Sequence, residues 1–219
     1  QGMRQYPVGP GSRFPFGVTR DNSGTNFSIW GLRSRGVELL LFERADSREP
    51  FQVIALDPVE NHTYSSWHVY VHGLPPGIFY GWRIDGPCNT EETGFRFDKE
   101  KVLVDPAARA VSDVLWDRRR AAMPGDNADA SIRGIVVHHD GYDWEGDRPL
   151  HRPSEQSVIY EMHVGGFTRH ASSGVKHPGT FKGVIEKIPY LKSLGVTDVE
   201  LMPVMAFDEQ AVPEAVAAR

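Results

Sequence analysis

The first half of the chain contains short runs in which hydrophobic and polar residues alternate. In residues 25–30, for example, Phe27 and Ile29 fall on one side, while Trp30 falls on the other. A period of two places alternate side chains on opposite faces of a β-strand. Runs of this kind recur between turns rich in glycine and proline, which predicts an antiparallel β-sandwich over residues 5–110. The expected strands are 25–30, 37–42, 51–56, 67–71 and 79–84.

Residues 111–155 lack this alternation. They contain several groups of turn-forming residues, such as Pro124-Gly125-Asp126-Asn127, and only 134–138 resembles a strand. Clusters of glycine, proline, aspartate and asparagine are typical of loops. We therefore interpret 111–155 as a connecting segment.

A third pattern begins at residue 156. Residues 157–164 predict a strand, 181–194 a helix, and 196–202 a second strand. Pro189 should kink or split the helix, and Gly195 stands where a glycine commonly ends one. This order predicts two parallel, neighbouring strands joined by a right-handed crossover. The apolar stripe expected on the helix consists of Phe181, Ile185, Ile188 and Leu191.

Composition and charge exclude several classes of protein. The 219 residues include 24 Lys and Arg against 29 Asp and Glu, a net charge of −5. Because no basic stripe is present, we predict no nucleic-acid partner. No apolar run approaches the roughly 18 residues of a membrane-spanning helix, so we predict no membrane association. Cys88 is the single cysteine and cannot form an intrachain disulfide, which favours a reducing compartment and a cytoplasmic protein.

Few residues suggest chemistry by themselves. His138-His139-Asp140 could supply metal ligands, but a polar strand end explains them better because supporting ligands are missing. We predict neither a metal nor another cofactor. The aromatic side chains of the first half are more informative, since a flat ring can stack on the apolar face of a sugar. Trp30 and Trp82 are the candidate carbohydrate-binding residues, and packing in the core or between domains is the alternative for each.

Motifs along nearly the whole chain resemble isoamylase-type glycogen debranching enzymes, which are glycoside hydrolases of the α-amylase superfamily. The resemblance begins at Tyr6-Pro7-Val8-Gly9 and includes the sequence from Tyr80 to Pro87. It continues with Ile159-Tyr160-Glu161-Met162-His163, which is similar to the first barrel strand of those enzymes, and with Glu200-Leu201-Met202-Pro203-Val204. Gly165 departs from the arginine associated with that strand end, so no sugar contact by that arginine is carried over.

The resemblance implies an immunoglobulin-like sandwich of the carbohydrate-binding-module type. It also implies that 156–219 is the truncated first βαβ portion of a (β/α)8 catalytic barrel. Family members hydrolyse α-1,6 branch points by a retaining mechanism with two carboxylates. In the family, these two carboxylates and a further Asp that helps to hold the sugar lie near the ends of barrel strands four, five and seven, so no catalytic residue is expected in this chain. His163 and Asp208 are candidate residues of the barrel mouth, and a solvated loop carboxylate is the alternative for Asp208.

Two functions remain open from the sequence. The first is the N-terminal fragment of a glycogen- or starch-debranching α-1,6-glucosidase, whose partner would be glycogen, amylopectin or limit dextrin. A branching enzyme or a trehalose-releasing hydrolase shares the order of sandwich and barrel. The second is a non-catalytic module that binds α-glucan or docks another domain. Two strands and a helix leave sheet edges uncovered, so self-association through exposed barrel edges is also expected.

Overall fold

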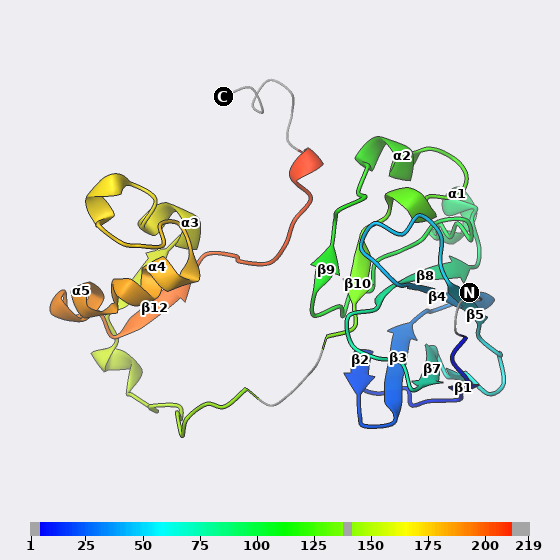
Figure 1. Cartoon of the computed structure of the whole chain (residues 1–219), viewed down its shortest axis with the longest axis horizontal. Coiled ribbons are helices and arrows are strands. Elements are labelled where there is room, and N and C mark those ends of the chain that lie inside the picture. The colour runs from blue at the N-terminus through cyan, green and yellow to red at the C-terminus, as the bar shows by residue number, and fades with distance from the viewer. Residues whose placement is uncertain (1–4, 138–141, 212–219) are drawn as a thin grey trace. The chain divides into compact units, whose positions relative to one another are not determined.

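The computed structural model describes residues 5–137 and 142–211 (Figure 1). It divides into two compact units, one made of the chain up to Tyr142 together with the segment from Glu209, and the other of Asp143–Asp208. Among the described residues, no helix combines the length and the hydropathy needed to cross a membrane.

The first unit is a β-sandwich of two antiparallel sheets. In the first sheet the strands lie in the order β1 (Val8–Gly9), β7 (Ser66–His72), β3 (Gly24–Trp30) and β2 (Gly17–Arg20), and β6 (His62–Thr63) pairs with β7. In the second sheet the order is β5 (Gln52–Ala55), β4 (Gly36–Phe42), β8 (Phe79–Asp85), β10 (Arg133–Ile135) and β9 (Val111–Ser112). Two short helices, α1 (Thr90–Thr93) and α2 (Arg118–Ala122), lie in the connections.

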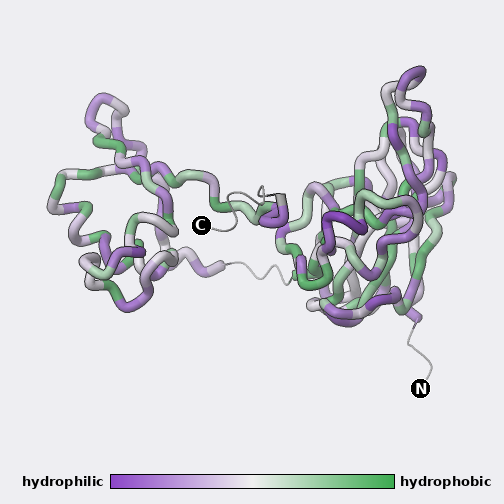
Figure 2. Tube along the Cα trace, turned by 90° about the horizontal axis from the view of Figure 1, so that it is seen from above, coloured by the Kyte–Doolittle hydropathy of each residue, from purple (hydrophilic) through white to green (hydrophobic). Residues whose placement is uncertain are grey.

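The inner faces of the two sheets form one hydrophobic core. Phe27 of the first sheet contacts Tyr80 and Trp82 of the second, with ring centroids 5.1 Å and 6.4 Å apart in edge-to-face geometry. All three side chains are fully buried. The alternation of hydrophobic and polar residues in the sequence therefore placed Phe27 and Ile29 on the correct, inward side of β3. Figure 2 shows hydrophobic segments, in green, interleaved with hydrophilic ones along the chain of this unit.

All five strands expected in the first half are present, and no strand end differs by more than one residue from the expectation. The second sheet also extends past residue 110, because β9 and β10 lie within the segment interpreted as a connection. Gly134 of β10 pairs with Tyr80, and a Cβ atom at Gly134 would lie 2.4 Å from the Tyr80 ring. The strand-like run at 134–138 overlaps β10, although its place in the sandwich was not expected, whereas β9 has only two residues, too few to show a period of two.

The second unit is a strand–helix–strand arrangement. Strands β11 (Ile159–Met162) and β12 (Asp198–Leu201) are parallel, as predicted, with Tyr160 opposite Val199. Between them lie α3 (Val164–Phe167), α4 (Phe181–Glu186) and α5 (Ile188–Ser193). Pro189 lies in the first turn of α5, so it splits the expected helix, as predicted. Gly195 follows Leu194, the C-cap residue of α5, with φ +81°, a conformation that glycine adopts without strain.

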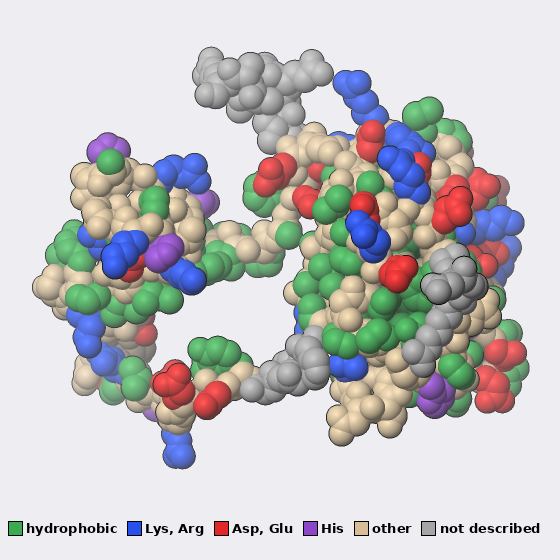
Figure 3. All heavy atoms as spheres, in the orientation of Figure 1, with side chains coloured by type: hydrophobic (Ala, Val, Ile, Leu, Met, Phe, Trp, Pro, Cys, Tyr) green, Lys and Arg blue, Asp and Glu red, His purple; other side chains and the backbone are tan. Residues whose placement is uncertain are grey.

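The apolar stripe of the split helix is only partly covered. Leu191 is buried, whereas Phe181, Ile185 and Ile188 are exposed. Hydrophobic side chains also reach the visible surface of this unit in Figure 3. The expected stripe is therefore present in the helices, but only one of its four residues is buried within this unit.

Candidate functional site

Residues 10–16, which follow β1, cross the outer face of the first sheet, and we call this segment the strap. Asn26 and Ser28 of β3 point to this face, opposite Phe27 and Ile29, and the strap buries them. The Ser12 backbone N–H donates to Asn26 Oδ1 at 2.8 Å, and Ser28 Oγ donates to the Arg13 carbonyl at 2.6 Å. His68 Nδ1 of β7 donates to the Pro10 carbonyl at 2.7 Å. These buried polar contacts fix the path of the strap.

Gly11 allows the strap to lie this close to the sheet. Its φ is +72°, and a Cβ atom there would lie 2.6 Å from Asn26 Oδ1 and 2.8 Å from the Tyr70 backbone nitrogen. Both the conformation and the space therefore require glycine. The strap is a close-fitting part of the sandwich.

An exposed aromatic patch lies where the strap leaves this face. Trp30, at the end of β3, is 57% exposed, and Tyr64, in the turn between β6 and β7, is 86% exposed. The two lie near each other because Trp30 pairs with Ser66 and the Gly31 N–H donates to the Ser65 carbonyl at 2.7 Å. The patch comprises Phe14, Phe16, Trp30 and Tyr64.

Arg13 connects members of this patch. Its guanidinium lies 4.9 Å from the ring centroid of Phe14 and 5.5 Å from that of Tyr64. Phe14 also contacts Phe16 edge to face, at 5.0 Å between centroids. A cation near the two rings adds attraction that holds them in place. The patch therefore presents several exposed rings, of which Trp30 lies on a strand and the others on the strap and the turn after β6.

The structure separates the two tryptophans that the sequence singled out. Trp30 is exposed on the patch, whereas Trp82 is fully buried in the core against Phe27. A buried ring has no face on which a sugar can stack, so the expectation for Trp82 is corrected to core packing. The cause is the register of β8, which places Trp82 opposite Leu39 on the inward face.

The sequence reasoning missed Phe14, Tyr64 and Arg13. Phe14 lies in a glycine- and proline-rich stretch without periodicity, and Tyr64 lies in a two-residue turn with φ +56°. The sequence does contain a signal, since Phe14-Pro15-Phe16 places two aromatic residues in a turn-rich segment. Their position beside Trp30 depends on the tertiary path of the strap.

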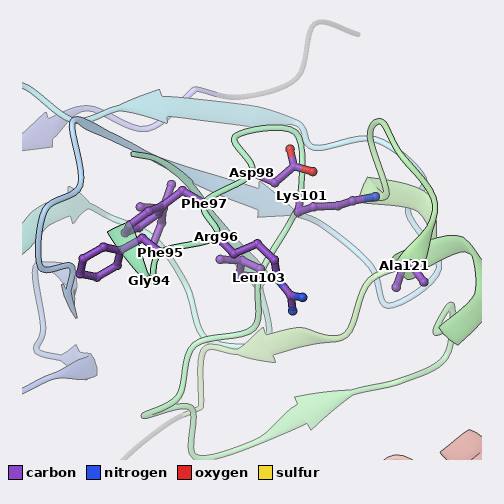
Figure 4. Close-up of a pocket in the computed structure, with 10 residues that line it drawn as sticks. Gly94, Phe95, Arg96, Phe97, Asp98, Lys101, Leu103 and Ala121 are labelled. Atoms are coloured by element: carbon purple, nitrogen blue, oxygen red, sulfur yellow. The ribbon is translucent and has the colours of Figure 1, made fainter. Parts of the chain in front are cut away.

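A wider cavity, about 710 Å³, lies between α2 and the loop that follows α1 (Figure 4). Phe95 and Phe97 stack at 5.8 Å between centroids, and the Lys101 side chain extends toward α2. The Lys101 ammonium donates to the backbone carbonyls of Met123 and Gly125, the latter at 2.8 Å. Lys101 therefore ties the loop to the segment after α2, which gives this cation a structural role.

The barrel-mouth candidates lie in the second unit. His163 follows β11 and caps α3, because its Nδ1 accepts a hydrogen bond from the Gly166 N–H at 3.0 Å. It lines a cavity of about 210 Å³ with Phe181 and residues 203–205 and 207, which follow β12. The cavity thus lies at the carboxyl ends of both parallel strands. Asp208 is half-buried and does not line this cavity.

Acidic and basic side chains are interspersed over the face of the first unit that Figure 3 shows. Within residues 5–137 and 142–211, no group of three or more His, Cys, Asp or Glu side chains is placed to hold a metal ion. The motif His138-His139-Asp140 lies outside the described residues.

Comparison with known proteins agrees with the sandwich and its position in the chain. Residues 15–108 match the family of carbohydrate-binding module 48, the isoamylase N-terminal domain. The chain is 39% identical over 208 residues to the chloroplastic isoamylase 1 of Arabidopsis thaliana, which covers 94% of this chain and 26% of that protein. It is 36% identical over 203 residues to a glycogen debranching enzyme of Yersinia enterocolitica, which covers 89% of this chain and 30% of that protein.

The fold is similar to that of solved pullulanases. The pullulanase from Bacillus acidopullulyticus superimposes with a TM-score of 0.68 and 25% identity, over 89% of this chain and 22% of that chain. The chain thus spans between about a fifth and a third of the length of these relatives. Its residues 15–108 are similar to carbohydrate-binding module 48, and the chain as a whole is similar to the N-terminal part of isoamylases and glycogen debranching enzymes.

Proposed function

We propose that this chain is the N-terminal, non-catalytic part of a debranching α-1,6-glucosidase and that its sandwich binds α-glucan through the exposed aromatic patch. The observation that carries the proposal is the exposure of Trp30 on a rigid sheet, within a domain that matches a carbohydrate-binding family. Relatives are named as glycogen debranching enzymes, and one related pullulanase is described as complexed with maltotriose. The substrate of the full enzyme is accordingly glycogen, amylopectin or limit dextrin.

The patch has the physical properties of a sugar platform. Sugar rings present apolar C–H faces that pack on aromatic rings, and preformed rings lose little entropy on binding. Here the backbone of Trp30 is held by pairing with Ser66, while Arg13 lies over the rings of Phe14 and Tyr64. A curved α-glucan chain of several glucose units can contact more than one of these rings at once.

The second unit supports assignment of residues 156–219 as the start of a (β/α)8 barrel. All four residues of β12 are exposed, as are three of the four in β11. Parallel strands are normally buried on both faces, so the exposure of these two strands is typical of a sheet that further strands and helices cover. His163 lies at the carboxyl end of β11, where barrel enzymes place their active sites. The same exposed edges support self-association when no further strands cover them.

The alternative function is domain docking without glucan binding. An exposed aromatic patch also suits packing against another protein domain, since large exposed apolar areas often mark interfaces. Glucan affinity of the 219-residue chain distinguishes the two functions. We further propose a cytoplasmic or other reducing location, supported by Cys88 being the single cysteine of the chain; some plant relatives are named as chloroplastic.

The test is titration calorimetry of the chain with maltotriose and maltoheptaose. We expect Trp30→Ala to weaken binding at least about tenfold, on the scale of losing one stacking contact, with an unchanged melting temperature. Trp144→Ala, at an exposed tryptophan of the second unit, is the matched control and should bind as the wild type does. If the wild-type chain binds neither sugar, glucan binding is rejected and domain docking becomes the proposed role.

A further inference from the structure

A second concave surface lies on the same sheet face as the aromatic patch. It is a cavity of about 370 Å³ between the strap, β7 and the end of β2, and we call it the strap groove. Its walls include the aromatic side chains of Phe14, Tyr70 and His72 and the polar side chains of Thr19 and Asp21. All of these residues belong to the sandwich unit.

The strap groove has a defined internal geometry. The Tyr70 hydroxyl donates to Asp21 Oδ1 at 2.5 Å, and the rings of Tyr70 and His72 meet edge to face at 4.8 Å. The N–H groups of Ser23 and Gly24 also donate to Asp21 Oδ1, at 2.7 Å and 3.1 Å. In the described part of the chain, Asp21 Oδ2 accepts no hydrogen bond, and neither does the Thr19 hydroxyl take part in one.

The protonation state of Asp21 follows from these contacts. The hydrogen bond from Tyr70, followed by that from the Ser23 backbone, lowers the pKa of Asp21 below its ordinary value of 3.8. Burial, together with the nearby Asp21 carboxylate, raises the pKa of Tyr70 to about 12. Near neutral pH the strap groove therefore holds one carboxylate with a vacant acceptor oxygen and one neutral phenol.

The strap groove and the aromatic patch are continuous. Phe14 belongs to both, and Asn26 of β3 lines the groove four residues before Trp30. At about 3.3 Å per residue, four residues along a strand span roughly 13 Å. A linear chain of several glucose units is long enough to contact both, whereas a short oligosaccharide occupies only one of them.

We propose that the strap groove is a second subsite for the same α-glucan chain that stacks on Trp30. This inference rests on the proposed function of the patch. The rings of Tyr70 and His72 would pack against a glucose unit, and Asp21 Oδ2 and the Thr19 hydroxyl would bond its hydroxyl groups. Asp21 is the one charged residue among those lining the groove. Its negative charge repels an anionic ligand, and a ligand with several positive charges could pair with only one carboxylate, so the groove suits a neutral ligand.

The experiment compares maltotriose with maltoheptaose on the 219-residue chain by titration calorimetry. We expect the wild-type chain to bind maltoheptaose more tightly than maltotriose. Asp21→Asn should weaken maltoheptaose binding about tenfold, because a charged hydrogen-bond partner is lost. It should leave maltotriose binding unchanged. Asparagine keeps an Oδ1 acceptor for the turn at Ser23 and Gly24. His72→Ala, at an exposed position, should weaken maltoheptaose binding in the same selective way.

Asp57→Asn is the matched control. Asp57 also accepts hydrogen bonds from backbone N–H groups two and three residues later, at 2.7 Å and 3.0 Å, but it does not line the strap groove. If Asp21→Asn and His72→Ala both bind maltoheptaose as tightly as the control does, the second subsite is rejected. If only Trp30→Ala then weakens glucan binding, the proposed function of the aromatic patch is retained. If the wild type binds neither sugar, both proposals fail together.

Discussion

The Tyr80 hydroxyl donates a hydrogen bond of 2.9 Å to Asp105 Oδ2 in the interior of the sandwich. Asp105 Oδ1 accepts a second bond from the Ala107 N–H at 2.8 Å. Burial raises the pKa of Asp105 above its ordinary value, although both hydrogen bonds act in the opposite direction. Burial likewise raises the pKa of Tyr80. The pair is therefore a buried carboxyl whose ionisation opposes folding.

This pair predicts a specific pH dependence of stability. A carboxyl with a raised pKa in the folded state takes up protons on folding, so its contribution is complete below 3.8 and is lost as the pH rises through the raised pKa. The difference in free energy of unfolding, wild type minus Asp105→Asn, should therefore fall with rising pH from about 3.8 upward. Urea unfolding over a pH series, followed by tryptophan fluorescence, measures this difference.

The comparison with a variant is essential because other carboxyls change stability in the opposite direction. The pKa values of Asp57 and Asp129 are lowered by backbone N–H donors and by Arg120, respectively. Their contributions cancel in the difference. The exposed Asp113 supplies a control as Asp113→Asn. A wild-type minus Asp105→Asn difference that stays level over this range would contradict the assigned role of Asp105.

Substitution of Trp82 should affect stability rather than sugar binding. Trp82 is fully buried, and its backbone exchanges hydrogen bonds with Leu103 at 3.0 Å and 2.8 Å. Because truncation leaves a large cavity, Trp82→Ala should lower the free energy of unfolding by about 3–5 kcal/mol. Trp30→Ala should change it by less than about 0.5 kcal/mol. Chemical denaturation of both variants tests this, and weakened glucan binding by a Trp82 variant of normal stability would reverse the assignment.

A substitution at the buried Arg133 should change the stability of the sandwich independently of Trp82. Its guanidinium is buried, lies 3.6 Å from the ring centroid of Phe42, and donates to the carbonyls of Ser47 and Ala128 at 2.5 Å and 2.6 Å. Burial lowers the pKa of Arg133 to about 10. Lysine cannot form this planar fork, so Arg133→Lys should destabilise the sandwich by about 2 kcal/mol.

The same denaturation experiment distinguishes this effect from a mere change of charge. Arg48 is an exposed arginine whose Nη1 lies 3.6 Å from Asp129 Oδ2. Because an exposed ion pair contributes little, Arg48→Lys should leave the free energy of unfolding nearly unchanged. Equal stability of the Arg133→Lys and Arg48→Lys variants would show that the buried guanidinium is not a structural clamp.

The accuracy of the sequence-based prediction followed the strength of the local pattern. Strands β3, β4, β7 and β8 each have seven residues, long enough for the alternation between buried and outward positions to appear. Pro189 lacks a backbone N–H, and its ring clashes with the preceding helical turn, so the break before α5 could be predicted from this residue alone. The position of Trp30 opposite Phe27 followed from alternation, whereas its exposure and the burial of Trp82 depended on which faces of the strands are covered.

The candidate site was less predictable because it depends on contacts between distant residues. The strap has no periodicity, and its position follows from hydrogen bonds such as that of Ser28 to Arg13. Tyr64 joins the patch through the pairing of β6 with β7, and Tyr70 meets Asp21 across 49 residues. Local residue patterns do not contain such tertiary relationships.

The exposed edge of the second unit leads to the last prediction, which concerns association of the chain with itself. Val199 and Leu201 of β12 are 41% and 40% exposed, and the strand pairs only with β11 among the described strands. An unpaired edge with apolar side chains promotes pairing between chains, and a lysine on the edge opposes it. We therefore expect concentration-dependent dimers in sedimentation velocity, weakened in Val199→Lys. Val59→Lys, at an exposed valine of the sandwich unit, should associate as the wild type does. A wild-type chain that stays monomeric up to the highest concentration tested would contradict association through this edge, while equal weakening by both variants would point to a general charge effect.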